Sequence, residues 1–301
     1  MADDTSSIGG YSPQVPLLAG AAEAQTRKSV RKWAYFTLAL VLAVAFVFPM
    51  YFMVTSGFKD EDEVLAVPIH WLPQNFQGLA QYQVAFNYQP ILRFFGNSLL
   101  VAVVDVVVTV FFSALAGYAF AKIPFRWKQF LFLFVLSTLM IPFQILVVPL
   151  YAEMHFLGWV NNYGGLIIPG IMNAFGVFMM RQFAFGIPNE LLDAARVDGA
   201  GEARIFWRIV LPLLAPACAS LATIIFLFSW NNFLWPLIIA QSSDLYTLPV
   251  GMQVFAQPYE QRSLWAPAMA VSTIATLPIA VIILFFQRYF VQGMVLSGLK
   301  G

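Results

Sequence analysis

Residues 187–216 read IPNELLDAARVDGAGEARIFWRIVLPLLAP and form the longest polar interruption in the C-terminal half of the chain. Pro188 suits the first turn of a helix, where a missing N–H costs nothing, and Glu190 suits the positive end of the helix dipole. Asp198-Gly199 is a turn signal that would end such a helix. The stretch therefore predicts a short helix, and the long apolar runs on either side predict that it connects two membrane spans.

The composition of the whole chain is that of a polytopic membrane protein. Of its 301 residues, 60% are apolar and only 10% are charged, against about 25% charged in typical soluble domains. A net charge of +1 provides no basic excess for binding nucleic acid. A single cysteine, Cys218, rules out an intrachain disulfide, and His70 and His155 lie too far apart in sequence to suggest a metal site.

Apolar runs long enough to cross a bilayer recur along the chain and predict an all-α fold. The expected spans cover about 34–56, 97–121, 129–152, 160–180, 213–240 and 266–287. The expected segments are a disordered tail at 1–32, a six-span domain at 33–301, a long folded loop at about 57–95, the polar loop at about 187–212 and a C-terminal tail at about 288–301. We therefore expect six transmembrane helices.

The distribution of basic residues predicts the orientation. If the N-terminus is cytoplasmic, only Lys59, Arg93 and Arg262 among the 16 lysines and arginines lie in segments outside the cell. Loops on the cytoplasmic side of membrane proteins carry the excess of lysine and arginine. Both termini and the 187–212 loop are therefore expected to be cytoplasmic.

The polar loop resembles the EAA loop of permease subunits of ABC importers, and in particular of the carbohydrate branch of the maltose-permease type. The match consists of Asp193-Ala194-Ala195, Gly199 and Ile209-Val210-Leu211-Pro212. One position departs from the pattern, because Asp193 replaces the leading glutamate and is one methylene shorter. The resemblance covers about residues 33–301 and implies the type I ABC-importer core in the inner membrane of a prokaryote.

The resemblance also implies a role for the segment 187–212, which we call the coupling segment: it docks into a groove on a cytoplasmic ATPase. Small residues allow close approach, and a carboxylate at the rim fixes the register. The residues to which this role is assigned are Glu190, Asp193, Ala194, Ala195, Asp198, Gly199, Leu211 and Pro212. The plainer alternative is an ordinary cytoplasmic loop that caps two spans.

No Gly-x-x-x-x-Gly-Lys-Ser/Thr motif occurs in the chain, so the phosphate cradle of that motif is absent. We therefore expect no cofactor in this chain and expect ATP to be hydrolysed by partner subunits. The implied partners are a second, homologous permease subunit, two ATPase subunits, an extracytoplasmic sugar-binding protein and membrane lipid.

Polar residues inside the predicted spans are candidates for the substrate pathway. Residues 229–236 read SWNNFLWP and combine amides with aromatic rings, a combination that suits sugars. Asp105 is an ionisable residue inside a span. The candidates are Trp230, Asn231, Asn232, Asp105 and Asn173. The alternatives are a tryptophan-rich membrane interface for residues 229–236 and helix packing for Asp105.

Two further segments resemble parts of maltose-type permeases. The loop that contains Gln257, Tyr259, Glu260, Gln261 and Arg262 resembles the extracytoplasmic loop that contacts the binding protein. The tail 293–301 resembles the one that reaches between the two ATPases, although a frayed end would explain it too.

Taken together, these features predict a permease subunit that imports a sugar, oligosaccharide or polyol delivered by a binding protein. A permease for glycerol phosphate is the alternative within the same class. A proton-coupled secondary transporter with Asp105 as the relay is a more distant one. We do not expect an enzyme, because no segment combines a nucleophile with a base or a set of metal ligands.

Overall fold

The computed structural model describes residues 15–256 and 264–298, with side chains described from residue 31 to 255 and from 264 to 286. All secondary structure in these ranges is helical. The chain divides into two compact units, residues 1–54 and 55–301, and each is described by itself.

The first unit consists of most of helix α1 (Val15–Ser56), whose part from Arg31 to Ser56 is long and apolar enough to cross a membrane. The expectation of a disordered tail up to residue 32 is wrong from Val15 onward. Residues 15–32 are rich in alanine, leucine, arginine and lysine, which favour helix. Because they directly precede the apolar part of α1, they extend an existing helix and need no new nucleation. Residues 1–14 of the expected tail lie outside the described ranges.

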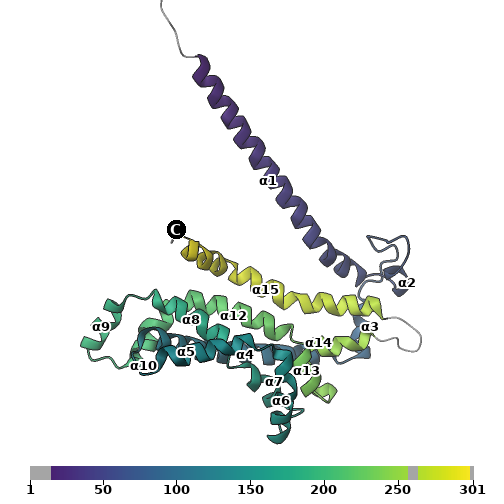
Figure 1. Ribbon diagram of the computed structural model, residues 1–301. Helices are drawn as coiled ribbons and strands as arrows, with labels where there is room; N and C mark the ends of the chain where they lie inside the picture. The colour runs from purple at the N-terminus through teal and green to yellow at the C-terminus, as the bar shows by residue number, and fades with distance from the viewer. Residues whose placement is uncertain (1–14, 257–263, 299–301) are drawn as a thin grey trace, which may run out of the picture. The chain divides into compact units, whose positions relative to one another are not determined.

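The second unit contains the other described helices (Figure 1). They are α2 (Glu61–Val64), α3 (Ala80–Tyr88), α4 (Ile91–Lys122), α5 (Lys128–Ser137), η1 (Thr138–Met140), α6 (Phe143–Phe156), α7 (Tyr163–Ile167), η2 (Ile168–Gly170), α8 (Ala174–Phe185), α9 (Asn189–Val197), α10 (Glu202–Ile205), the π-helix η3 (Phe206–Val210), α11 (Leu211–Leu213), α12 (Ala215–Trp230), α13 (Leu234–Ile239), η4 (Ser243–Leu245), α14 (Leu248–Met252), η5 (Gln253–Ala256) and α15 (Trp265–Gly298).

Several predicted spans are bent in the structure. In the described ranges, α1, α4 and α15 are the three helices that could each cross a membrane unbroken. Three further helix pairs qualify only as broken spans: 128–140 with 143–156 bends by 101°, 163–170 with 174–185 by 44°, and 202–213 with 215–230 by 75°. The number of spans is therefore three to six, which includes the predicted six.

Proline explains the position of these breaks, because its ring removes a donor and clashes with the preceding turn. Pro142 is the residue before α6, at the break of the span predicted for residues 129–152. Pro169 lies in η2, at the second break. Pro212 lies in α11, just before the third break. Irregular backbone at membrane depth is tolerated only where protein or water satisfies it, so the breaks mark candidate functional positions.

Helix α4 is the centre of the second unit. It packs along α8 and α12, and α12 packs on α15 (Figure 1). A Cβ atom placed on Gly117 of α4 would lie 2.5 Å from the Cβ of Met180 in α8, so the two helices can approach this closely only because Gly117 has no side chain. Close approach at small residues is the usual way in which membrane helices associate.

The long loop predicted for residues 57–95 is ordered, and it is partly helical through α2 and α3. The carboxylate of Glu61 accepts hydrogen bonds from the backbone N–H groups of Trp265 (2.7 Å) and Ala266 (3.0 Å) and so caps the start of α15. Lys59 Nζ donates to the carbonyl of His70 at 2.6 Å. Burial lowers the pKa of Lys59, although the nearby Glu63 carboxylate acts in the opposite direction. The loop thus fixes the entry to the last long helix.

Candidate functional site

Helix α9 forms the short helix that the sequence predicts in the coupling segment. It begins directly after Pro188 and ends at Val197, with Asp198 as the C-terminal cap. The N–H of Gly199 donates to the carbonyl of Arg196 (3.0 Å), and that of Ala200 donates to the carbonyl of Ala195 (2.9 Å). This pair of bonds is the Schellman motif, which needs a left-handed residue after the cap, and Gly199 has a φ of +78°.

One face of α9 is anchored and the other is free within the second unit. Leu192 is 1% exposed and packs in the apolar cluster formed by the ends of α4, α8 and α12. Val197, by contrast, is 88% exposed, and Leu191 is 43% exposed. The candidates Glu190, Asp193, Ala194, Asp198 and Gly199 are exposed as well, whereas Ala195 is half-buried. The helix therefore offers a mixed face of small, apolar and acidic residues.

A chain of polar contacts connects α9 with α10 and α4. Arg196 donates from Nη1 to Asp193 Oδ1 at 2.7 Å and from Nε to Glu202 Oε1 at 2.8 Å. The Tyr118 hydroxyl on α4 donates to Glu202 Oε2 at 2.5 Å. Glu202 and Asp193 raise the pKa of Arg196 above its ordinary value, so the guanidinium stays charged. Asp193 thus takes part in a network that reaches a long helix.

Lys122, the last residue of α4, holds the start of the coupling segment. Its Nζ donates to the carbonyl of Ile187 at 2.6 Å and to Oδ1 of Asn189 at 2.8 Å. The sequence analysis did not predict roles for Tyr118, Lys122 and Glu202. A partial signal was present, because Lys122 ends a predicted span, and Arg196 and Glu202 are oppositely charged residues close together in the coupling segment. These side chains join α9 and its flanking residues to α4.

The second half of the coupling segment leads into span five through an irregular helix. Residues Phe206–Val210 form the π-helix η3, and the candidates Leu211 and Pro212 follow in α11. Leu211 is half-buried and Pro212 is exposed. Single π-turns are rare and often lie at functional sites. The coupling segment therefore meets α12 at an angle of 75° rather than as a straight extension.

A second group of polar residues lies around the middle of α4, on α4 itself, on α12 and at the break before α8. Ser229 Oγ donates to Oδ2 of Asp105 at 2.5 Å, and Thr109 Oγ1 donates to the carbonyl of Ile171 at 3.3 Å. Asn173 caps α8, because its Oδ1 accepts from the N–H of Gly176 at 2.9 Å. The candidate Asp105 therefore lies between α12 and the break that precedes α8.

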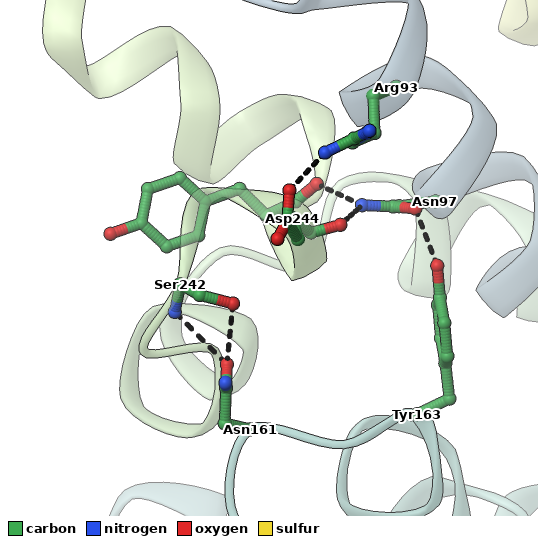
Figure 2. Close-up of polar contacts among 7 residues, drawn as sticks. Arg93, Asn97, Asn161, Tyr163, Ser242 and Asp244 are labelled. Atoms are coloured by element: carbon green, nitrogen blue, oxygen red, sulfur yellow. Dashed lines mark hydrogen bonds and ion pairs between the residues drawn. The ribbon is translucent and has the colours of Figure 1, made fainter.

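At the end of the second unit opposite α9, a cluster around Asn97 connects three segments (Figure 2). Asn97 Nδ2 donates to the carbonyls of Asp244 (2.8 Å) and Tyr246 (2.9 Å). Its Oδ1 accepts from the Tyr163 hydroxyl at 2.7 Å, and Arg93 forms an ion pair with Asp244. Asn97 therefore holds the start of α4 against α7 and against the loop after α13.

Asn161 supports the same cluster from the turn before α7 (Figure 2). Its Oδ1 accepts from the backbone N–H of Ser242 at 3.0 Å and from the Ser242 hydroxyl at 3.1 Å. Its own N–H donates to the carbonyl of Ile239 at 2.9 Å. The sequence analysis did not predict the Asn97 cluster, because its members lie far apart along the chain.

The family profile described as "Binding-protein-dependent transport system inner membrane component" matches residues 109–296, which include the whole coupling segment. The chain belongs to this family. It is therefore a permease subunit of an ABC importer and a membrane component.

Named relatives of this permease are similar over most of their length. The arabinooligosaccharides transport system permease protein AraQ of Halalkalibacterium halodurans is 39% identical, over 86% of this chain and 93% of AraQ. AraQ of Bacillus subtilis is 35% identical over 91% of this chain and 97% of its own. The sn-glycerol-3-phosphate transport system permease protein UgpE of Yersinia enterocolitica is 31% identical over 85% of this chain and 93% of UgpE.

The fold of this permease is also found in a solved structure. A chain in the crystal structure of a bacterial ABC transporter involved in the import of the acidic polysaccharide alginate has a TM-score of 0.79. The two chains are 20% identical, and the match covers 88% of this permease and 98% of that chain. The all-α type I ABC-importer fold expected from the sequence is therefore confirmed.

The three candidates for the substrate pathway within residues 229–236 differ in their surroundings. Trp230 is 2% exposed, stacks on Phe226 at a centroid distance of 5.5 Å, and donates from Nε1 to the carbonyl of Ala275 at 3.0 Å. Asn231 is exposed and donates to the carbonyl of Leu227 at 2.8 Å, while Asn232 is half-buried. Of the three, Trp230 packs inside the permease, and Asn231 and Asn232 lie at the break after α12.

Two groups of predicted residues lie wholly or partly outside the described ranges. Gln257, Tyr259, Glu260, Gln261 and Arg262, the predicted contacts of the binding protein, lie outside the described residues. The C-terminal tail expected at about 288–301 is helical up to Gly298 as part of α15, and residues 299–301 lie outside the described ranges.

Proposed function

We propose that this permease imports a sugar, oligosaccharide or polyol. The AraQ relatives support this substrate class, because they are the two most similar of the named relatives above and match nearly their whole length. The UgpE relative favours glycerol phosphate as the second candidate. Membership in a binding-protein-dependent family argues against a proton-coupled secondary transporter.

In this proposal the permease works with a second, homologous permease subunit, two ATPase subunits and an extracytoplasmic sugar-binding protein. ATP is hydrolysed by the ATPase subunits and no cofactor binds to this chain. Both termini and the coupling segment lie in the cytoplasm, as the distribution of lysine and arginine suggests. The subunit itself performs no chemical reaction.

The observation that carries the proposal is the division of α9 into a buried face and an exposed face. One face is anchored by Leu192, and the other exposes Glu190, Ala194 and Val197 on a helix that ends cleanly at Gly199. An exposed amphipathic face of this kind fits a groove on a partner. The face presented to the ATPase would include the acidic side chains at the start of α9.

The contacts behind α9 suggest how movement of the ATPases would reach the membrane. Displacement of α9 would be passed to α4 through Arg196, Glu202 and Tyr118, and through Lys122 at the start of the segment. Since α4 packs along both α8 and α12, the bundle would respond as a unit and change the access of the cavity from one side to the other. Alternating access of this kind needs no binding of ATP by the permease.

The proposal is tested by reversing one charge on the exposed face. We expect Asp193→Lys to abolish co-purification of the ATPase subunits and ATP-driven uptake, because it puts a cation on the docking face and breaks the contact with Arg196. Asp62→Lys is the matched control, since Asp62 is exposed in α2, far along the chain from the coupling segment. Normal assembly and uptake in the Asp193→Lys complex would refute the assignment of α9 as the docking helix.

A further inference from the structure

Only one of the two carboxyl oxygens of Asp105 accepts a hydrogen bond from the residues that the structure describes. Its Oδ2 accepts from Ser229, but its Oδ1 is buried and accepts no hydrogen bond from any residue that the structure describes. The described ion pairs do not include Asp105 either. Valines flank it on both sides in α4, so the group lies in an otherwise apolar part of the helix. Buried polar atoms are normally hydrogen-bonded, so the Oδ1 atom is available to accept a hydrogen bond from a molecule other than the described residues.

The free oxygen lies next to a break in the helical backbone. A Cβ atom placed on Gly170 would be 4.0 Å from Asp105 Oδ1, and Gly170 is the last residue of η2. Gly170 and Met172 are exposed, and residues 171–173 are not helical. Interrupted spans in transporters commonly form substrate sites, because their backbone groups remain available for hydrogen bonds.

We propose that Asp105, Ser229 and the break at residues 168–173, together called the Asp105 site, bind hydroxyl groups of a neutral sugar or polyol on its way through the membrane. The inference rests on the proposed function and specifies its substrate class. A carboxylate oxygen with free lone pairs accepts from sugar hydroxyls, and such charge-assisted bonds are short and strong. The Asp105 site would thus orient a hydroxylated substrate without holding it permanently.

The same site disfavours anionic substrates. A phosphate or carboxylate group beside Asp105 would meet a like charge at short range in a medium of low dielectric constant, where repulsion is strong. No lysine or arginine among the described residues forms an ion pair with Asp105 that could offset this repulsion. Arabinooligosaccharides, rather than glycerol phosphate, represent the class of substrate that the Asp105 site accepts.

The charge and the water access of the site can be measured without knowing the substrate. In the assembled complex with Cys218→Ala, Gly170→Cys places a thiol next to Asp105. We expect the cationic reagent MTSET to label this thiol about tenfold faster than the anionic MTSES, because a nearby carboxylate attracts the first and repels the second. Adding Asp105→Asn should remove most of this preference. A thiol that neither reagent labels, or a ratio unchanged by Asp105→Asn, would overturn the proposal.

Measurements of uptake then test whether the transporter selects neutral over anionic substrates. Proteoliposomes with the full complex and its binding protein are given arabinotriose, maltotriose, glycerol or sn-glycerol-3-phosphate. We expect ATP-driven uptake of a neutral compound only, reduced about tenfold or more by Asp105→Asn, since a charge-assisted contact is lost, and unchanged by the control Asp62→Asn. Uptake of sn-glycerol-3-phosphate alone, or uptake by Asp105→Asn within twofold of wild type, would contradict the inference. Absence of ATP-driven uptake for every compound would contradict the proposed function instead, and the labelling ratio would still decide about the Asp105 site.

Discussion

The backbone of Gly199 adopts a conformation that residues with a Cβ atom rarely adopt. Its φ of +78° lies in the left-handed region, yet a Cβ atom added there would meet nothing within 4 Å. In the Schellman motif this conformation lets the N–H groups of Gly199 and Ala200 satisfy carbonyls at the end of α9. The glycine of the EAA-like pattern therefore has a structural explanation: it ends α9 and turns the chain toward α10.

A substitution at Gly199 should cost stability through the backbone alone. We expect Gly199→Ala to destabilise the end of α9 by about 1 kcal/mol, because a left-handed conformation is unfavourable for any residue with a Cβ. Gly201→Ala is the control, since Gly201 has a φ of −70° and also has open space around it. Thermal unfolding of the purified complex, together with the yield of bound ATPase, measures the difference. Equal behaviour of the two variants would argue against this account.

At the scale of elements, the contact between α4 and α8 depends on two glycines. Gly117 of α4 faces Met180, and Gly176 of α8 faces Ser113, so that each glycine lets the other helix approach. This contact carries the end of α4 that holds Tyr118 and Lys122, and thus the supports of α9. Closely packed helices transmit displacement well, because a packed interface resists deformation.

This contact makes a prediction within a single helix. Gly117→Ala should destabilise the permease by about 1–3 kcal/mol, because the added methyl group overpacks the interface with α8. Gly96→Ala in the same helix should be neutral or stabilising, since a Cβ there meets nothing within 4 Å and alanine favours helix. The midpoint of thermal unfolding in detergent measures both variants. A Gly117→Ala protein as stable as Gly96→Ala would show that the helices are not in close contact there.

At the scale of the second unit, α4 connects the coupling segment with the Asn97 cluster. One end of α4 holds the coupling segment through Tyr118 and Lys122, and the other holds the Asn97 cluster; along the helix, Asp105 lies between Asn97 and Tyr118. A movement of α9 would therefore reach the loop after α13 through a single continuous helix. This arrangement also predicts that the two ends lie on opposite sides of the membrane.

The orientation is tested with single cysteines in a Cys218→Ala background. Ala203 in α10 and Ser243 in η4 are both exposed. Helix α10 lies at the opposite end of the second unit from α13, the helix that directly precedes η4 (Figure 1). We expect an impermeant maleimide to label Ser243→Cys in spheroplasts, and to label Ala203→Cys only after the membrane is permeabilised. Labelling of Ala203→Cys in intact spheroplasts would place the coupling segment outside the cell and would refute the proposed orientation.

Much of the fold could be predicted because its signals are local. Hydropathy located the segments that could cross a membrane, and the sequence between Pro188 and Gly199 predicted the short helix, whose end at Asp198 is confirmed. The bend of 101° after Met140 was not predicted, although Pro142 marked its position, because a proline indicates a break but not its angle. The helical continuation of α1 back to Val15 was missed, because polar composition was read as disorder.

The sequence by itself determined the apolar segments that could cross a membrane, the short helix α9 and the membership in the permease family, since apolar length, turn residues and motif spacing are properties of neighbouring positions. Only the tertiary structure showed that Tyr118 and Glu202 support α9, that Trp230 packs inside, and that Asn97 joins three segments. It also showed that Asp105 has a free oxygen beside the break at Gly170. The physical reason is that hydrogen bonds between helices depend on how the helices pack, and the packing partner of a side chain is not encoded near it in the chain.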